Sequence, residues 1–196
     1  MTFTIRAASP LDVLARFFPA AGLSLLSLAV GVPASLAQGS LFNAIPVDES
    51  KFILVAAPIG KGERSQLNIY EQRSDKRPCY SSGTGTPAVV DPLLSKFDFT
   101  GICNRYIDGN GYSLRIGGND LGTRYRLVVV KTNSDIELLA TPTRDRSQPS
   151  YVVARCGGTS NGFLKLNFEP GWTLMRRAYG KKALGHIYLY RESPAQ

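Results

Sequence analysis

The densest group of side chains that could bind a charged partner lies near the C-terminal end of the chain. Basic and aromatic residues occur together there around a glycine: Arg176, Arg177, Lys181, Lys182, Trp172 and Tyr179. Cations beside aromatic rings could engage an acidic polysaccharide, an anionic lipid headgroup or an acidic protein. A solvated charged turn has the same composition, so the binding hypothesis depends on how the fold places these side chains.

His186 is the single histidine of the chain and therefore the only candidate for a histidine general base. Nucleophilic catalysis would also need a nucleophile within hydrogen-bonding distance and a group that orients the base. Cys156 or a serine could supply the nucleophile, but we expect no Gly-x-Ser-x-Gly elbow, and no cysteine stands in a recognisable protease context. A hydrogen-bonded structural histidine is therefore the favoured interpretation.

Acidic residues could support glycosidase chemistry, which needs two carboxylates close together in a cleft. The candidates are scattered along the chain: Asp98, Asp108, Asp120, Glu137 and Glu169. Their spacing does not show that any two of them meet. The sequence therefore favours a protein that is not an enzyme, with a small hydrolase as the alternative.

Three oxygen-bearing side chains in glycine-rich segments could bind a hard cation such as calcium: Asp108, Asn110 and Asp120. The EF-hand spacing fails, because Tyr112 takes the fifth position and Asn119 the twelfth, where a glutamate is required. Asx-Gly turns have the same composition without a metal. The cysteines also lack the spacing of a zinc site. We therefore expect neither a metal nor a cofactor.

Three cysteines, Cys79, Cys103 and Cys156, allow three single-bridge pairings and leave one thiol over. Turn-forming residues adjoin the first two, which bracket a stretch rich in glycine, serine and proline from Ser81 to Pro87. This favours a Cys79–Cys103 bridge, which would stabilise the fold by roughly 3 kcal/mol in the chain-entropy model. Cys156 ends an apolar run, as a small buried residue would.

The composition is that of a folded protein with a strong positive charge. The chain has 196 residues, of which 43% are hydrophobic and 19% charged, and this excludes intrinsic disorder. The net charge of +8 favours acidic partners. Nucleic acid is not an expected partner, because the chain is predicted to be exported.

The prediction of export rests on residues 1–37, which have the form of a secretory signal peptide. Arg6 and Arg16 precede an apolar run from Ala20 to Val32, and a proline and small residues follow it. The run is shorter than the roughly 20 residues that span a bilayer. We predict cleavage after Ala37, a location in the periplasm, cell envelope or medium, and no transmembrane span in the mature chain.

Short apolar and β-branched runs recur along the rest of the chain and predict an all-β fold. Several alternate polar and apolar side chains, as half-buried strands do. Turn-forming residues separate the runs, and Asn110-Gly111 indicates a hairpin. The predicted strands are Phe52 to Ala57, Gln66 to Gln72, Tyr112 to Ile116, Tyr125 to Lys131, Ile136 to Ala140, Tyr151 to Arg155, Phe163 to Phe168, Trp172 to Tyr179 and His186 to Tyr190.

About nine to ten short strands of this kind predict an antiparallel β-sandwich or a squat barrel. At most one short helix is expected, near residues 92–96, with Asp91 as its N-cap. We assign residues 38–50 to a leader segment that is expected to be flexible. Residues 51–192 are then a single β domain.

Seven segments of the mature chain form a combined pattern: Phe52 to Gly60, Gln66 to Gln72, Phe97 to Cys103, Asn110 to Arg115, Asp120 to Gly122, Pro170 to Trp172 and Leu184 to Tyr188. This combination resembles the DUF3747 family, a set of exported cyanobacterial proteins with no assigned function. The family pattern has cysteines at the positions of Cys79 and Cys103, which supports that pairing, and none at Cys156. The resemblance implies a place in the periplasm or cell envelope and no particular activity.

The sequence leaves two hypotheses for the function. The first is a non-enzymatic envelope module that binds an acidic envelope glycan or another envelope protein through the basic and aromatic residues around Gly180. The second is a small hydrolase that acts on an envelope polymer. That alternative requires His186, or two carboxylates, to meet a partner group in a cleft.

Overall fold

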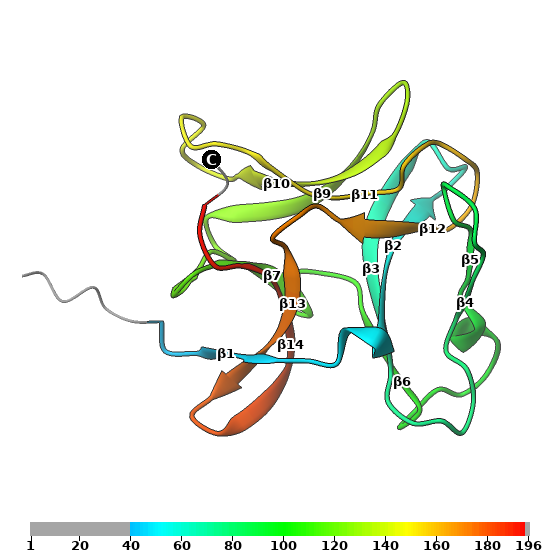
Figure 1. The fold of residues 1–196 in the computed structure, drawn as a ribbon, viewed down its shortest axis with the longest axis horizontal. Coiled ribbons are helices and arrows are strands. Elements are labelled where there is room, and N and C mark those ends of the chain that lie inside the picture. Colours follow the sequence, from blue (N-terminus) through cyan, green and yellow to red (C-terminus); the bar gives the residue numbers. More distant parts are fainter. Residues whose placement is uncertain (1–39, 195–196) are drawn as a thin grey trace, which may run out of the picture. The chain divides into compact units, whose positions relative to one another are not determined.

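The computed structural model describes residues 40–194, which form two β-sheets and a two-stranded ribbon (Figure 1). The predicted signal peptide, residues 1–37, lies outside the described residues. The all-β prediction is confirmed, because the elements are strands apart from two single turns of 3-10 helix. Within residues 40–194, no helix has the length and apolar character needed to cross a membrane.

The first sheet contains seven strands, six of which close into a barrel. The strands are β2 (Phe52–Ile59), β3 (Arg64–Gln72), β6 (Cys103–Tyr106), β9 (Tyr125–Lys131), β10 (Ile136–Pro142), β11 (Tyr151–Arg155) and β12 (Leu164–Phe168). Around the barrel the order is β2-β12-β11-β10-β9-β3, and β3 pairs again with β2. The start of β3 pairs with β9 and its end pairs with β6, so β3 joins the barrel to the extra strand.

The second sheet is curled and has five strands in the order β1-β13-β14-β7-β8. They are β1 (Asn43–Pro46), β13 (Thr173–Tyr179), β14 (Lys182–Arg191), β7 (Tyr112–Ile116) and β8 (Asn119–Asp120). The expectation of a wholly antiparallel fold is wrong at one pair, because β7 and β14 are parallel. Four barrel strands lie between them in the chain, which provides the long connection that parallel pairing needs.

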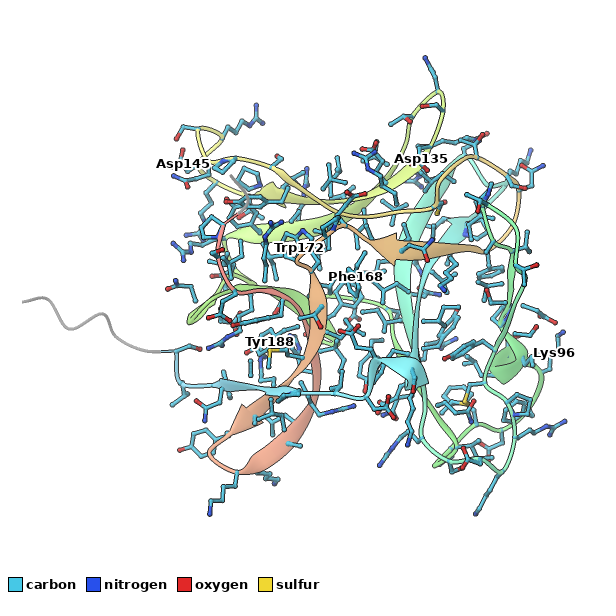
Figure 2. All side chains as sticks on the ribbon, viewed as in Figure 1. Lys96, Asp135, Asp145, Phe168, Trp172 and Tyr188 are labelled. Atoms are coloured by element: carbon cyan, nitrogen blue, oxygen red, sulfur yellow. A yellow bond between two sulfur atoms is a disulfide. The ribbon has the colours of Figure 1, made fainter. Side chains whose placement is uncertain are left out.

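Both faces of β2 are buried, which explains its uninterrupted apolar sequence. Leu54 and Ala56 belong to the main core, which the barrel shares with the curled sheet. Ile53 and Val55 alternate with them and pack into a second cluster on the other face of the strand. A strand covered on both sides has no solvent-facing positions for polar residues. Side chains of the two sheets fill the space between them (Figure 2).

A long excursion between β3 and β6 covers the second cluster. It carries the ribbon of β4 (Ser81–Ser82) and β5 (Val90–Asp91) and the single turn η2 (Leu93–Lys96). The short helix near residues 92–96 is thus confirmed as one 3-10 turn. Its N-cap residue is Pro92, however, and Asp91 instead ends β5 and pairs with Lys96. A second single turn, η1 (Glu49–Lys51), was not predicted.

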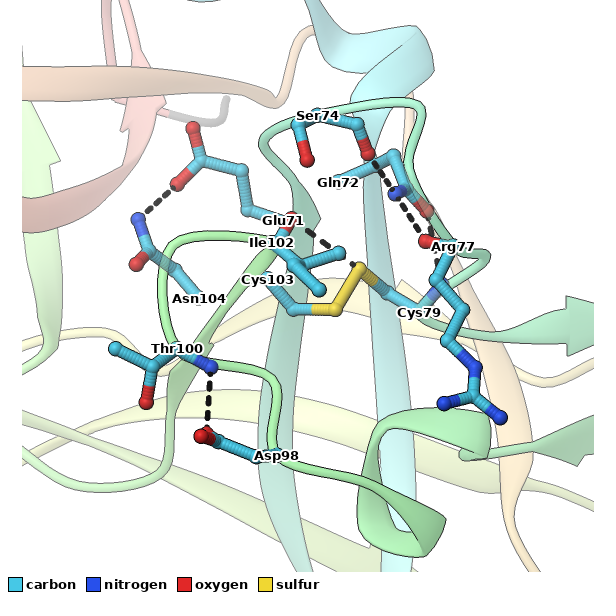
Figure 3. The surroundings of a disulfide bond; sticks show 10 residues. All are labelled: Glu71, Gln72, Ser74, Arg77, Cys79, Asp98, Thr100, Ile102, Cys103 and Asn104. Atoms are coloured by element: carbon cyan, nitrogen blue, oxygen red, sulfur yellow. Dashed lines mark hydrogen bonds between the residues drawn. A yellow bond between two sulfur atoms is a disulfide. The ribbon is translucent and has the colours of Figure 1, made fainter.

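The predicted disulfide, Cys79–Cys103, ties this excursion to the start of β6 (Figure 3). Gln72, the last residue of β3, accepts a hydrogen bond from the Cys79 backbone N–H at 2.9 Å. The Gln72 side chain also donates to the carbonyl oxygens of Ser74 and Arg77. One amide side chain therefore holds the loop that brings Cys79 to Cys103, and both cysteines are buried in the second cluster.

Two further segments differ from the sequence-based predictions. β1 lies within residues 38–50, which were assigned to a leader, and pairs with β13, so the β domain begins before residue 51. Asn110-Gly111 does not close a hairpin, because the flanking strands β6 and β7 belong to different sheets. Asp108 instead accepts hydrogen bonds from the backbone N–H groups of both residues and shapes a crossing loop. The short strands were missed because two to four residues are too few to show alternation.

Candidate functional site

The pleat of β13 divides the predicted basic group. Arg176 and Arg177 are neighbours in this strand, so their side chains point to opposite faces of the curled sheet. Arg176 pairs with Glu71 of the barrel, and Arg177 pairs with Asp120 of β8. Both arginine side chains are at most 20% exposed. Each arginine therefore already has a carboxylate partner inside the fold.

The remaining predicted binding residues are also separated. Lys181 and Lys182 are exposed at the β13–β14 turn, and Tyr179, which is 58% exposed, pairs in register with Lys182. Trp172 precedes the other end of β13, where it is buried and packs edge-on against Tyr151 (Figure 2). The structure thus brings Tyr179 and the two lysines together and places Trp172 in the core.

The Glu71 carboxylate is the centre of a polar cluster where the barrel meets the curled sheet. Its Oε1 accepts a hydrogen bond from Arg176 Nη2 at 2.6 Å. Its Oε2 accepts from Tyr106 Oη at 2.6 Å and from Asn104 Nδ2 at 2.7 Å. Arg176 also donates to Tyr106 Oη and lies over the ring of Phe52. The cluster therefore joins β2, β3 and β6 of the first sheet to β13 of the second.

Hydrogen bonds and opposite charges keep Glu71 and Arg176 ionised in this cluster. Burial by itself raises the pKa of Glu71, but hydrogen bonds from Tyr106, Asn104 and Arg176 outweigh it, and the pKa lies below its ordinary value. Burial acts in the opposite sense on Arg176, whose pKa is nevertheless raised by its contacts with Tyr106 and Glu71. Both groups are therefore ionised at neutral pH. Each charge offsets the free-energy cost of removing the other from water.

Two cavities open beside this cluster, with volumes of about 490 Å³ and 420 Å³. Asn104 and Gly185 line both cavities, so the two adjoin, and we call them together the Gly185 groove. The first is lined by Glu71, Arg73, Asn104, Arg176, Ala183, Leu184 and Gly185. The second is lined by Asn104, Arg105, Tyr106, Ile107, Asp108, Asn110, Gly111 and Gly185. Lys182 is the first residue of β14, and it and Lys181 directly precede the groove-lining residues Ala183 to Gly185.

A second polar network lies on the other face of β13. Asp120 Oδ2 accepts hydrogen bonds from Arg177 Nη2 at 2.8 Å and from Tyr188 Oη at 2.7 Å. Burial raises the pKa of Asp120, but the hydrogen bonds from Tyr188, the Gly122 backbone and Arg177 outweigh it and lower the pKa overall. Arg177 also lies over the rings of Phe42 and Tyr188. This network ties β8, β13 and β14 together.

His186 and Ser113 are buried side by side at the edge of the same network. His186 Nε2 lies 2.8 Å from Ser113 Oγ, and His186 Nδ1 lies 2.7 Å from the Asn110 carbonyl oxygen. A carbonyl can only accept, so Nδ1 carries the proton and Nε2 accepts from the serine hydroxyl. The histidine thus has a nucleophile-bearing neighbour and an orienting group, but both side chains are at most 7% exposed.

The profile of the DUF3747 family, described as a protein of unknown function, matches residues 20–194. The chain belongs to the DUF3747 family. This confirms the resemblance seen in the sequence, and it adds no activity. No curated protein and no solved structure matches the chain. Export of this DUF3747 chain, its place in the envelope and the cyanobacterial source implied by the resemblance stay predictions.

The third cysteine of this DUF3747 chain has a buried thiol of low reactivity. Cys156 is free and lies in the main core with no exposed surface. Burial, followed by the charge of Asp135, raises the pKa of its thiol to about 12. Because the thiolate is the reactive form, this cysteine is not a catalytic nucleophile near neutral pH. Its interpretation as a small buried residue is confirmed.

The predicted oxygen ligands of a cation are used elsewhere. Asp120 is paired with Arg177, while Asp108 accepts backbone hydrogen bonds from its own loop. Asn110 lies in the same loop, and its backbone carbonyl oxygen accepts a hydrogen bond from His186 Nδ1. Among residues 40–194, no three His, Cys, Asp or Glu side chains are grouped as a metal site would need.

Two of the five scattered carboxylates do converge, but on an arginine. Glu137 and Glu169 both form ion pairs with Arg155 on the barrel, the second at 3.0 Å. Asp98 caps its own turn through the Thr100 backbone N–H. The structure therefore gives no support to a pair of glycosidase carboxylates at these positions.

We expect His186 to make the free energy of unfolding depend on pH. Burial, which outweighs the Asn110 carbonyl, lowers the pKa of His186 below its ordinary 6.5 in the folded protein. At pH values between the folded pKa of His186 and 6.5, the unfolded chain binds more protons than the folded protein does. The contribution of His186 to the free energy of unfolding is therefore complete above pH 6.5 and is lost as the pH falls below it. Urea unfolding at about pH 7.5 and about pH 5.5 measures this loss.

The control is His186→Gln, because no second histidine is present in the chain. Carboxylates with lowered pKa values, such as Glu71 and Asp120, contribute the same sign of change, but at more acidic pH. The variant should therefore show little pH dependence in this window. Equal losses in the variant and the natural protein would contradict the assignment to His186.

Proposed function

We propose that the protein is an exported, non-enzymatic module of the cell envelope that binds an acidic glycan in the Gly185 groove. The observation that carries this proposal is the groove itself, where hydrogen-bonding and charged side chains of two sheets face two adjoining cavities. Support for export comes from the predicted signal peptide at residues 1–37 and from the disulfide, which forms in oxidising compartments.

The lining of the groove suits a polymer rich in hydroxyl and carboxylate groups. Asn104 offers its amide oxygen, and the backbone at Gly185 has no side chain to obstruct an approaching sugar. Arg73 and Arg105 are exposed at the groove and add positive charge. Two adjoining open cavities fit consecutive units of an extended chain better than one enclosed small molecule. The full chain has a net charge of +8, which loss of Arg6, Asp12 and Arg16 with the predicted signal peptide would change only to +7, and this favours an acidic polymer over a neutral one.

The binding residues proposed here differ in part from those predicted from the sequence. Arg176 and Arg177 form ion pairs within the fold, so their removal would damage the protein as well as a binding surface. Lys181 and Lys182 remain available beside the groove. We therefore assign glycan contact to Arg73, Lys182 and their neighbours, and give the two arginines of β13 a positioning role.

Glycan binding is tested with a soluble polyuronate and, as the neutral probe, dextran. We expect Arg73→Ala/Lys182→Ala to weaken polyuronate binding by about fivefold, because two exposed charge contacts are lost. Dextran should bind weakly to either form. Affinity electrophoresis in gels that contain each polymer measures the change, and added salt should reduce polyuronate binding.

The matched control is Arg144→Ala/Arg146→Ala, which removes the same charge from the exposed loop between β10 and β11. This control should bind polyuronate as the natural protein does. If both variants lose affinity equally, the protein binds through its overall charge, and the groove assignment is wrong.

A small hydrolase is the second candidate function, and one observation favours it. The Ser113–His186 hydrogen bond has the polarity of a nucleophile and its base. Against it, Ser113 is 7% exposed, and Gly122 packs so closely that an added Cβ would lie 3.0 Å from Ser113 Cβ. We therefore favour a structural role for the pair. A fluorophosphonate probe that labelled Ser113 in the folded protein would reverse this preference.

A further inference from the structure

A third cavity, of about 380 Å³, opens at the end of the barrel where three loops meet. The loops join β2 to β3, β9 to β10 and β11 to β12 (Figure 1). Pro58 and the buried Ile136 supply apolar surface, whereas most of the other lining residues are polar or glycine. The lining is Pro58, Gly60, Lys61, Gly62, Ser65, Lys131, Ile136, Ser160, Asn161 and Gly162. We call this cavity the barrel-end pocket.

The charge of the barrel-end pocket is wholly positive. Lys61 and Lys131 are exposed, and neither forms an ion pair with a residue in the described part of the chain. No carboxylate lines the pocket. Asp135, in the turn between β9 and β10, is not among the lining residues, and its Oδ1 accepts hydrogen bonds from the Gly158 and Ile136 backbone N–H groups. Two cations therefore face the cavity without a partner of opposite charge.

Neutral hydrogen-bond donors accompany the two lysines. Ser65 and Ser160 carry hydroxyls, and Asn161 carries an amide. Ser160 is also the centre of a Gly-x-Ser-x-Gly pattern over residues 158–162, so the expectation that the chain lacks this motif is wrong. A nucleophile elbow requires a strand-to-helix turn, whereas this pattern lies between two strands, and the only histidine contacts Ser113. The pattern is therefore better explained by a loop that presents polar groups to a ligand.

We propose that the barrel-end pocket binds a small molecule that carries a phosphate group. Lysine ammonium groups are strong partners of phosphate, and hydroxyls and amides supply further donors to its oxygens. The volume is that of a ligand pocket and exceeds what a single anion fills. The apolar surface of Pro58 and Ile136 can take the non-phosphate part of the ligand, such as a sugar ring.

This pocket is separate from the Gly185 groove. Ser65 at the start of β3 lines the pocket, and Glu71 near its end lines the groove. Six positions along a strand correspond to roughly 20 Å. A single sugar unit cannot occupy both sites, so the phosphate proposal does not depend on glycan binding in the groove, and either can fail alone.

Isothermal titration calorimetry with glucose 6-phosphate, inorganic phosphate and glucose tests the proposal. We expect saturable binding of glucose 6-phosphate, weaker binding of inorganic phosphate and none of glucose. Lys61→Ala/Lys131→Ala should weaken glucose 6-phosphate binding by at least about tenfold, because two charged contacts to one phosphate are lost. Both lysines are exposed, so the variant should fold, and its unfolding transition checks this.

The charge-matched control is Lys51→Ala/Lys76→Ala, which removes two exposed lysines that do not line the pocket. This control should keep the affinity of the natural protein for glucose 6-phosphate. The proposal is overturned if neither phosphate probe binds saturably, or if the two double variants lose affinity equally. If inorganic phosphate binds as tightly as glucose 6-phosphate, the site recognises the free anion, and the assigned sugar-sized ligand is wrong.

Discussion

Cys79→Ala/Cys103→Ala is expected to lower the free energy of unfolding by about 3 kcal/mol. The bridge closes a loop of 24 residues between β3 and β6, and its loss releases the conformational entropy of that loop in the unfolded chain. The same residues cover the outer faces of β2 and β3 through a separate apolar cluster. That cluster should therefore loosen first, while the main core, which contains neither cysteine, stays folded at low denaturant.

The measurement is urea unfolding of the oxidised protein, and Cys156→Ala is the matched background. That substitution removes the free buried thiol, so no alternative bridge can form in either protein. Hydrogen exchange at Val55 and Tyr70, which pack in the outer cluster, should quicken more than exchange at Leu138 in the main core. Equal unfolding midpoints with and without the bridge would show that packing alone holds the excursion.

The strands with the clearest pattern could be predicted from the sequence because alternating or apolar runs mark an extended segment, even where, as in Tyr112 to Ile116, both faces are buried. Tyr112 to Ile116, Tyr125 to Lys131 and Tyr151 to Arg155 begin and end where predicted. A run of apolar or alternating residues is a local property of the sequence, and pairing within the sheets does not change where these three strands begin and end. The family, the all-β class and the disulfide were predicted for similar reasons, since each leaves a pattern along the chain.

The sequence could not predict which strands pair or which residues make up the candidate site. The parallel pairing of β7 with β14 joins residues more than seventy positions apart, for example Tyr112 with Ile187, and no local pattern encodes it. The Arg176-Arg177 pair looks like one basic patch along the sequence, yet the pleat sends its members to opposite faces. Glu71 gave no signal in the sequence, because β3 also carries arginine, serine, asparagine and glutamine side chains and one acid among them does not stand out.

Glu71→Ala is expected to lower the free energy of unfolding by about 2 to 3 kcal/mol. The Arg176 side chain is 17% exposed and that of Glu71 is 12% exposed, so water cannot replace the lost partner fully. Removal of the carboxylate also leaves Tyr106 Oη and Asn104 Nδ2 without their main acceptor. The Arg176 guanidinium is then left without its carboxylate partner between the barrel and the curled sheet. An unpaired buried charge lowers the free energy of unfolding by more than the loss of packing around the Glu71 side chain does.

The control is Asp91→Ala, which breaks an ion pair of similar length in a different setting. Lys96 Nζ lies 2.8 Å from Asp91 Oδ2, but the two side chains are 60% and 48% exposed, so water replaces the contact. Its loss should therefore change the free energy of unfolding by less than about 0.5 kcal/mol. Chemical denaturation of both variants measures the difference. If the two losses were equal, distance alone would govern these ion pairs, and burial could not be the reason why Glu71 holds the two sheets together.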